Sequence, residues 1–170
     1  MESVVTKEVA AALKKIPRTI PDTICAELFR AKRVFVWGIG RSGMIGKMFA
    51  IRLRHLGIES WFVDEPICPP FAKNDLLFVF SKTGKKKMLM QPVAVAKREK
   101  MRIVGISSPD TPLLKRVHVP LPVPLSSSKQ FGGSLFEQCL FLTLETCVER
   151  YRSMRRISFN AMERNHANWE

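Results

Sequence analysis

The chain has 170 residues, of which 46% are hydrophobic and 25% are charged. This length and composition fit one globular domain, and nothing in them indicates a disordered chain. Its 28 lysines and arginines outnumber 15 acidic residues, and the net charge of +13 favours anionic partners.

The expected elements begin with two helices, over residues 6–16 and 22–31, the second capped by Asp22. Five short runs then predict strands: the first is of the kind that is buried on both faces, and the last, which contains prolines, suits a sheet edge. These strands are expected at residues 33–37, 60–63, 75–80, 102–107 and 117–123. Longer helices are expected at residues 44–56, 85–100 and 132–154, with a short helical crossover at 109–115. The alternation predicts an α/β fold, a three-layer sandwich whose mostly parallel sheet is covered on both faces.

We expect one domain over residues 1–170, with N-terminal helices in 1–32 and a polar C-terminal arm in 155–170. The basic residues are spread along the chain, without a tail or an RNA-binding motif, so nucleic acid is not an expected partner. No run reaches the ~18 apolar residues of a membrane span, and the first 16 residues lack the apolar core of a signal peptide. A membrane partner is therefore not expected.

The four cysteines lack CxxC spacing, and the three histidines do not cluster with them. Disulfide frameworks belong to short secreted chains, so we expect free, buried thiols in a reducing cytoplasm. The same spacings argue against a metal site.

Residues 38–43, GIGRSG, follow the first strand directly and open onto a helix. Glycines allow tight turns there, and the amides of a helix N-terminus attract anions. We therefore assign Gly40, Arg41 and Ser42 to a phosphate-binding loop. A dinucleotide site is an alternative for this spacing, but Asp64 is the only candidate for the acidic residue that such a site needs.

A second loop, residues 81–84, follows the third strand. Its two hydroxyls, from Ser81 and Thr83, and its Gly84 also suit phosphate. An ordinary strand-to-helix turn with a hydroxyl cap would have the same residues. Two such loops after neighbouring strands strengthen the case, because ligands of open α/β sheets lie at the carboxyl ends of the strands.

These loops occur in a longer order of motifs: GIGRSG, FAIRLRHLGIES, FSKTG, GGSLFEQ and NHANWE. The order resembles the sugar isomerase (SIS) family and, within it, the 6-phospho-3-hexuloisomerases. The resemblance runs from about residue 33 to residue 170. It implies a five-stranded parallel sheet of flavodoxin-like order and a homotetramer with sites at subunit interfaces.

The resemblance also implies the conversion of D-arabino-3-hexulose 6-phosphate, a phosphorylated sugar, to fructose 6-phosphate through an enediol, without any cofactor. Its place would be the ribulose monophosphate pathway of formaldehyde assimilation. Glu137 would be the base, His166 would assist from across a subunit boundary, and His55 completes the catalytic set. Each has a plainer interpretation: Glu137 forms a capping box with Ser134, His166 is solvated, and His55 is structural.

The second loop departs from the SGSGET pattern of the family. Lys82 replaces a glycine, Lys85 a glutamate and Lys86 a threonine. We keep all three lysines as candidate substrate contacts, because they supply positive charge, though not a shaped cradle. The alternatives are a different sugar-phosphate isomerase, or a module that binds a sugar phosphate without catalysis.

Overall fold

A computed structural model describes residues 3–125 and 127–169. At its centre lies a sheet of strand order β2-β1-β3-β4-β5, in which every neighbouring pair is parallel. The strands are β1 (Val34–Gly38), β2 (Ser60–Phe62), β3 (Leu76–Phe80), β4 (Arg102–Ser107) and β5 (Val119–Pro122). The predicted α/β fold with a five-stranded parallel sheet of flavodoxin-like order is therefore confirmed. Glu170, the end of the last motif, lies outside the described residues.

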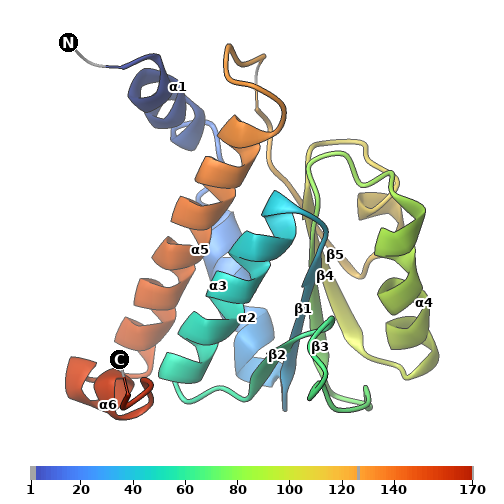
Figure 1. Ribbon diagram of the computed structural model, residues 1–170, viewed down its shortest axis with the longest axis vertical. Helices are drawn as coiled ribbons and strands as arrows, with labels where there is room; N and C mark the ends of the chain where they lie inside the picture. Colours follow the sequence, from blue (N-terminus) through green and yellow to red (C-terminus); the bar gives the residue numbers. More distant parts are fainter. Residues whose placement is uncertain (1–2, 126, 170) are drawn as a thin grey trace.

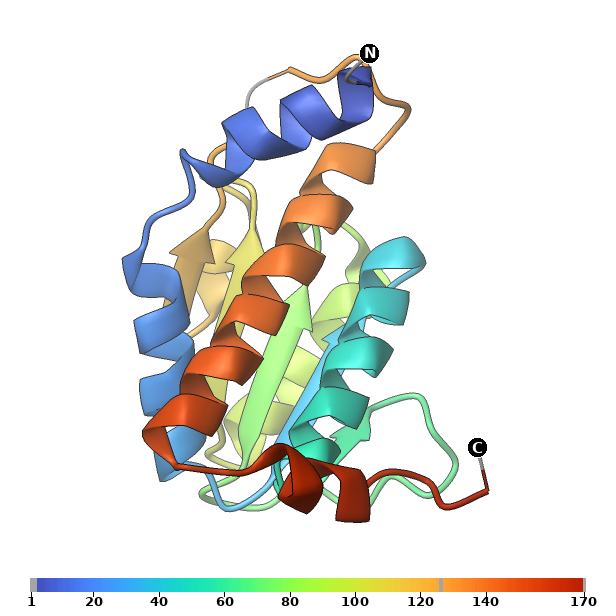
Figure 2. The same cartoon turned by 90° about the vertical axis from the view of Figure 1, so that its left-hand side faces the viewer.

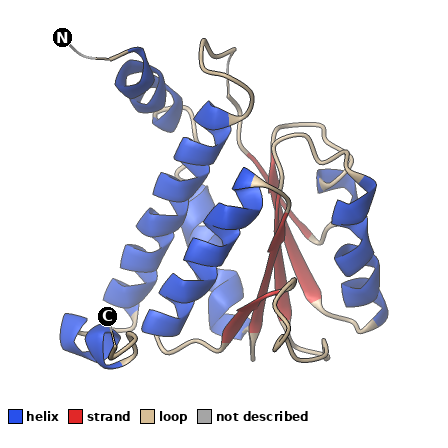
Figure 3. Cartoon of the chain, viewed as in Figure 1, coloured by secondary structure: helices blue, strands red, loops and turns tan. Residues whose placement is uncertain are grey.

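Helices cover both faces of the sheet, as Figures 1 and 3 show. On one face lie α2 (Thr19–Arg30), α3 (Arg41–His55) and α5 (Ser134–Met154), with α1 (Val4–Leu13) and α6 (Phe159–Arg164) packed at the two ends of α5. On the other face lie α4 (Met90–Arg98) and the short 3-10 helices η1 (Lys87–Leu89) and η2 (Leu114–Arg116).

Two apolar cores follow from the alternation of side chains along each strand. Val34 and Val36 of β1 face the core beneath α2, α3 and α5, whereas Phe35 faces the core beneath α4. All three side chains are fully buried. The apolar strand runs therefore predicted the sheet correctly, because residues on both faces of each central strand are covered.

The turn from β1 into α3 is tighter than the sequence suggested, and α3 begins at Arg41 rather than at residue 44. Gly40 takes a positive φ of 61°, which favours glycine. A Cβ atom on Gly43 would lie 2.5 Å from the carbonyl oxygen of Gly38. Glycine at position 43 thus lets the first turn of α3 lie directly against the end of β1.

Two further helix starts differ from the prediction, each at a proline. The second helix begins at Thr19, so Asp22 lies inside its first turn and does not cap it. Pro21 lies in that turn, where no backbone N–H is needed. Similarly, α4 begins at Met90 with Pro92 in its first turn, after η1. Lys85 and Lys86 therefore belong to the loop and not to the predicted helix.

The four cysteines form no disulfide, as expected. Cys25, Cys139 and Cys147 are fully buried, and burial raises the pKa of Cys139 to about 11, so this thiol stays protonated at neutral pH. Cys68 differs from the expectation because it is only partly buried. Among the helices of the described residues, none has the length and apolarity to cross a membrane.

Candidate functional site

The first predicted phosphate loop lies at the carboxyl end of β1, where the chain turns into α3. Ser42 is buried in the first turn of α3, whereas Gly40 and Arg41 are exposed at the tip of the turn. The N-terminal amides of α3 and the Arg41 guanidinium together present positive charge at this edge of the sheet. The geometry is therefore suited to an anion.

Glu137 lies in the first turn of α5 and reaches this loop. Its Oε2 atom is 2.8 Å from Nε of Arg41, and its side chain is only 12% exposed. Nη1 of Arg41 also donates a hydrogen bond of 3.0 Å to Oγ of Ser134. Ser134 in turn donates to the carbonyl oxygen of Phe131, and the cap position of α5 is Gly133. Instead of forming a capping box with Ser134, Glu137 is thus held over the first loop by Arg41.

The second loop lies after β3, next to the first, because β1 and β3 are paired. The hydroxyl of Ser81 accepts a hydrogen bond of 3.0 Å from the amide of Gly84. Gly84 has a positive φ of 59°, and a Cβ atom there would lie 2.8 Å from Cβ of Leu113. This loop therefore has a fixed turn that depends on Ser81 and on a glycine at position 84.

Lys82, the predicted departure from the pattern that the second loop resembles, has no positive φ. Its Nζ atom donates a hydrogen bond of 2.8 Å to the carbonyl oxygen of Gly132, just before α5. Thr83, Lys85 and Lys86 are exposed beside it. The structure thus brings the first loop, the second loop and the start of α5 to one place, with Glu137 between them.

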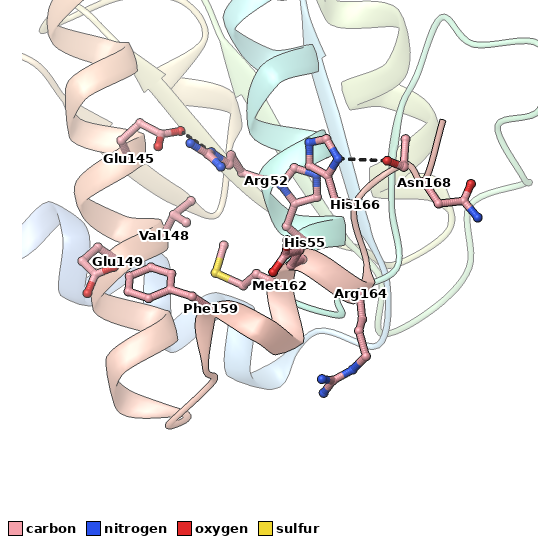
Figure 4. A pocket seen from close by; sticks show the side chains of 12 residues that line it. Arg52, His55, Glu145, Val148, Glu149, Phe159, Met162, Arg164, His166 and Asn168 are labelled. Carbon is pink, nitrogen blue, oxygen red and sulfur yellow. Dashed lines mark hydrogen bonds and ion pairs between the residues drawn. The ribbon is translucent and has the colours of Figure 1, made fainter. Parts of the chain in front are cut away.

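The two predicted catalytic histidines lie together elsewhere. His55 is the last residue of α3, and its ring centroid is 4.8 Å from that of His166, which follows α6 (Figure 4). Nδ2 of Asn165 donates a hydrogen bond of 3.1 Å to the carbonyl oxygen of His55. Arg41 and His55 are at opposite ends of α3, so about 20 Å of helix separates them at 1.5 Å per residue. Within one chain, the histidines therefore do not meet Glu137.

A groove of about 740 Å³ opens beside the histidines, between α3, α5 and α6. Arg52 and Glu145 form an ion pair of 3.2 Å across it, drawn in Figure 4, and Phe159 and Met162 supply apolar lining. Sequence reasoning missed Glu145, because it lies on a mainly apolar helix far along the chain from its partner. Its charge on that helix was the only available signal.

The described residues contain no group of three or more histidine, cysteine, aspartate or glutamate side chains that could hold a metal ion. The chemistry that this arrangement offers is a carboxylate held beside a loop whose amides and guanidinium are suited to an anion. Such a carboxylate can take a proton from a bound substrate, provided that the substrate's anionic group occupies the loops.

Comparison with known proteins gives relatives over most of the chain. The sequence profile of the SIS domain matches residues 27–126. A 3-hexulose-6-phosphate isomerase of Methanocaldococcus jannaschii is 30% identical over 150 residues, which cover 86% of this chain and 82% of that protein. The enzyme of the same name from Mycobacterium gastri is 29% identical, over 99% of this chain and 89% of its own.

A solved structure has a similar fold over nearly the whole chain. It belongs to a protein of Methanococcus jannaschii for which a function as 3-hexulose-6-phosphate isomerase has been inferred. The TM-score is 0.88 at 27% identity, over 97% of this chain and 96% of that one.

Proposed function

The chain belongs to the SIS domain family, and we propose that it converts D-arabino-3-hexulose 6-phosphate to fructose 6-phosphate. The observation that carries this proposal is the position of Glu137, which lies between two anion-suited loops and 2.8 Å from Arg41. Relatives named 3-hexulose-6-phosphate isomerase, from three organisms and 29–30% identical, point to the same substrate.

The reaction moves a carbonyl from C3 to C2 of the sugar. A base removes the proton from C2, a 2,3-enediol forms, and the proton returns to C3, while one proton passes between the two oxygens. We assign the removal and return of the carbon-bound proton to Glu137, since a single carboxylate between adjacent carbons can serve both. This chemistry requires no metal or organic cofactor.

The phosphate group would bind at the start of α3, where Gly40, Arg41 and Ser42 offer backbone amides, a guanidinium and a hydroxyl. Lys85 and Lys86 stand exposed on the neighbouring loop and would add charge. Arg41 already contacts Glu137. A bound phosphate would therefore compete with Glu137 for Arg41 and leave the carboxylate nearer to the sugar carbons.

The histidines enter this scheme through a second copy of the chain. An apolar stripe on α3 points to solvent: Met44, Met48 and Ile51, which are 60%, 48% and 55% exposed. Their spacing of four and three residues places them on one face of the helix. Burial of this stripe against a second copy would remove exposed apolar surface from water.

The middle of α3 is Met48, with seven residues on each side. If two copies of α3 pack antiparallel about a two-fold axis beside Met48, Arg41 of one copy lies opposite His55 of the other. His166, next to His55, would then approach the sugar oxygens beside Glu137. We propose a homo-oligomer built on this contact, with a tetramer as the assembly that the family implies, and a cytoplasmic location consistent with the free thiols.

The direct test supplies the purified protein with the 3-hexulose 6-phosphate and couples fructose 6-phosphate formation to a dehydrogenase. We expect turnover, and we expect Glu137→Gln to lower kcat by about 10²–10⁴ while sugar-phosphate binding persists. Glu59→Gln, the same change on an exposed glutamate before β2, is the matched control and should behave as wild type. Thermal stabilisation by sugar phosphate without any turnover would contradict the proposal and would favour a binding module.

A further inference from the structure

The segment that leads into α5, residues 127–133, has no regular secondary structure. Phe131 in this segment is 94% exposed, and Gly132 takes a positive φ of 64°. Apolar packing therefore holds little of this segment, and hydrogen bonds hold it instead.

Glu8 of α1 accepts three hydrogen bonds from consecutive residues of this segment. Oε2 accepts from Oγ of Ser128 at 2.6 Å and from Nε2 of Gln130 at 3.1 Å, and Oε1 accepts from the backbone amide of Lys129 at 2.8 Å. Oγ of Ser128 also accepts a hydrogen bond from the amide of Gln130. One carboxylate thus orders a turn that lies 120 residues away in the sequence.

These contacts are charge-assisted, because Glu8 is ionised. The hydrogen bond from Ser128, followed by that from the amide of Lys129, lowers the pKa of Glu8 below its usual value. An ionised carboxylate offers acceptor sites only, which matches the three donors that it meets. Figure 2 shows how the backbone brings these groups together, with α1 crossing above the start of α5 and the connecting loop beside it.

The ordered turn continues into the candidate site without interruption. Phe131 follows Gln130, and its carbonyl oxygen accepts from Oγ of Ser134 at 2.9 Å. The carbonyl oxygen of Gly132 accepts from Lys82, and that of Gly133 accepts from the amide of Glu137 at 3.0 Å. The segment is therefore fixed by Glu8 at one end and by Lys82 at the other.

We propose that Glu8 is a positioning residue: by holding residues 128–130 it fixes the first turn of α5, from which Glu137 reaches the substrate. The inference rests on the proposed function, in which Glu137 is the base. Glu8 itself does not contact the phosphate loops. Its loss should therefore disturb proton transfer more than substrate binding.

The experiment compares Glu8→Ala, Glu8→Gln and Ser128→Ala with wild type in the coupled isomerase assay. We expect Glu8→Ala to lower kcat up to about a hundredfold, the scale of a misplacement of 1 Å, with KM changed less than about twofold. Glu8→Gln keeps one acceptor oxygen and should recover part of kcat. Ser128→Ala removes one donor from the loop side and should show a smaller loss. Glu59→Ala and Glu59→Gln are the matched controls.

Hydrogen exchange gives a second readout that does not depend on catalysis. The amides of Lys129 and Gln130 should exchange faster in Glu8→Ala than in wild type, with the interior of α5 unchanged. A wild-type kcat in Glu8→Ala would overturn the inference while leaving the proposed function intact. So would a kcat loss that is matched by an equal rise in KM. If wild type shows no turnover, the proposed function fails, and unchanged exchange at residues 129 and 130 would then refute the tether as well.

Discussion

The close approach of β1 and α3 makes Gly43→Ala a sharp test of how the first loop is held. Gly43 lies inside α3, so helix propensity alone predicts that alanine stabilises the protein by up to about 1 kcal/mol. The added Cβ, however, would lie 2.5 Å from the carbonyl oxygen and 2.9 Å from the carbonyl carbon of Gly38. Both are backbone atoms, which cannot turn aside as a flexible side chain can.

The crowding should outweigh the propensity. Overpacking of a tight site costs typically about 1–3 kcal/mol. Because the crowded atoms belong to the backbone, we take the upper part of this range, about 2–3 kcal/mol, which leaves a net loss of about 1–2 kcal/mol after the gain of about 1 kcal/mol in propensity. Each kcal/mol lowers Tm by about 2–4 °C in a chain of this size. Gly46→Ala is a graded comparison, because its Cβ would meet side-chain atoms of Val36, Phe62 and Phe80 at 3.0–3.3 Å. It should cost less than Gly43→Ala.

Thermal unfolding followed by circular dichroism measures both variants, and the isomerase assay reports on the loop. We expect Gly43→Ala to lower kcat/KM as well as Tm, because relief of the contact must shift Gly38 or the start of α3. A Tm at or above that of wild type would refute the reasoning, since it would show that the turn relaxes freely around the new methyl group.

Three further outcomes are expected. Arg102→Ala removes the two hydrogen bonds of 3.0 and 3.1 Å to the buried carboxylate of Glu27 and should lower the free energy of unfolding by about 1–3 kcal/mol in urea titrations. The pKa of His118 is lowered by burial and, next, by the nearby charge of Arg102, and its neutral Nδ1 atom accepts a hydrogen bond from the amide of Ile103. Because the unfolded chain then binds a proton more readily than the folded one, the free energy of unfolding should fall as the pH falls below about 6.5. His118→Gln should flatten this part of the pH dependence of unfolding, and an unchanged slope would contradict the assignment. Met48→Asp should dissociate the proposed oligomer in sedimentation and abolish turnover, whereas an active, undissociated variant would exclude the α3 contact.

The sheet could be predicted from the sequence because each strand has a local sequence pattern. Each central strand is a short apolar run covered on both faces, and β5 carries the prolines that an edge tolerates. Helix starts were predicted less well. The sequence predicts that Gly43 lies in a loop, but it lies in α3, where its missing side chain lets the helix approach β1. Asp22 reads as a cap, but Thr19 can begin the helix two residues before Pro21.

In the candidate site, too, some features could be predicted from the sequence and others could not. Arg41 and Glu137 could be named from motifs, but their ion pair joins residues far apart in the sequence and has no local pattern. The contact between Glu8 and Ser128 is a stronger example, since neither residue belongs to a motif that the sequence singles out. Such contacts depend on where α1 crosses α5, and that crossing is determined by the packing of whole helices.

Lys82 shows how the structure changes the meaning of a departure from the family pattern. The loss of a glycine there would matter if the backbone needed a positive φ, but the positive φ of this loop lies at Gly84, which the chain keeps. The lysine side chain then gains a contact that glycine cannot make, with the carbonyl oxygen of Gly132. This contact ties the second loop to the start of α5, the same segment that Glu8 holds from the other side. The Nζ atom of Lys82 therefore braces the start of α5 beside Glu137, and the replacement of glycine by lysine is compatible with a working base.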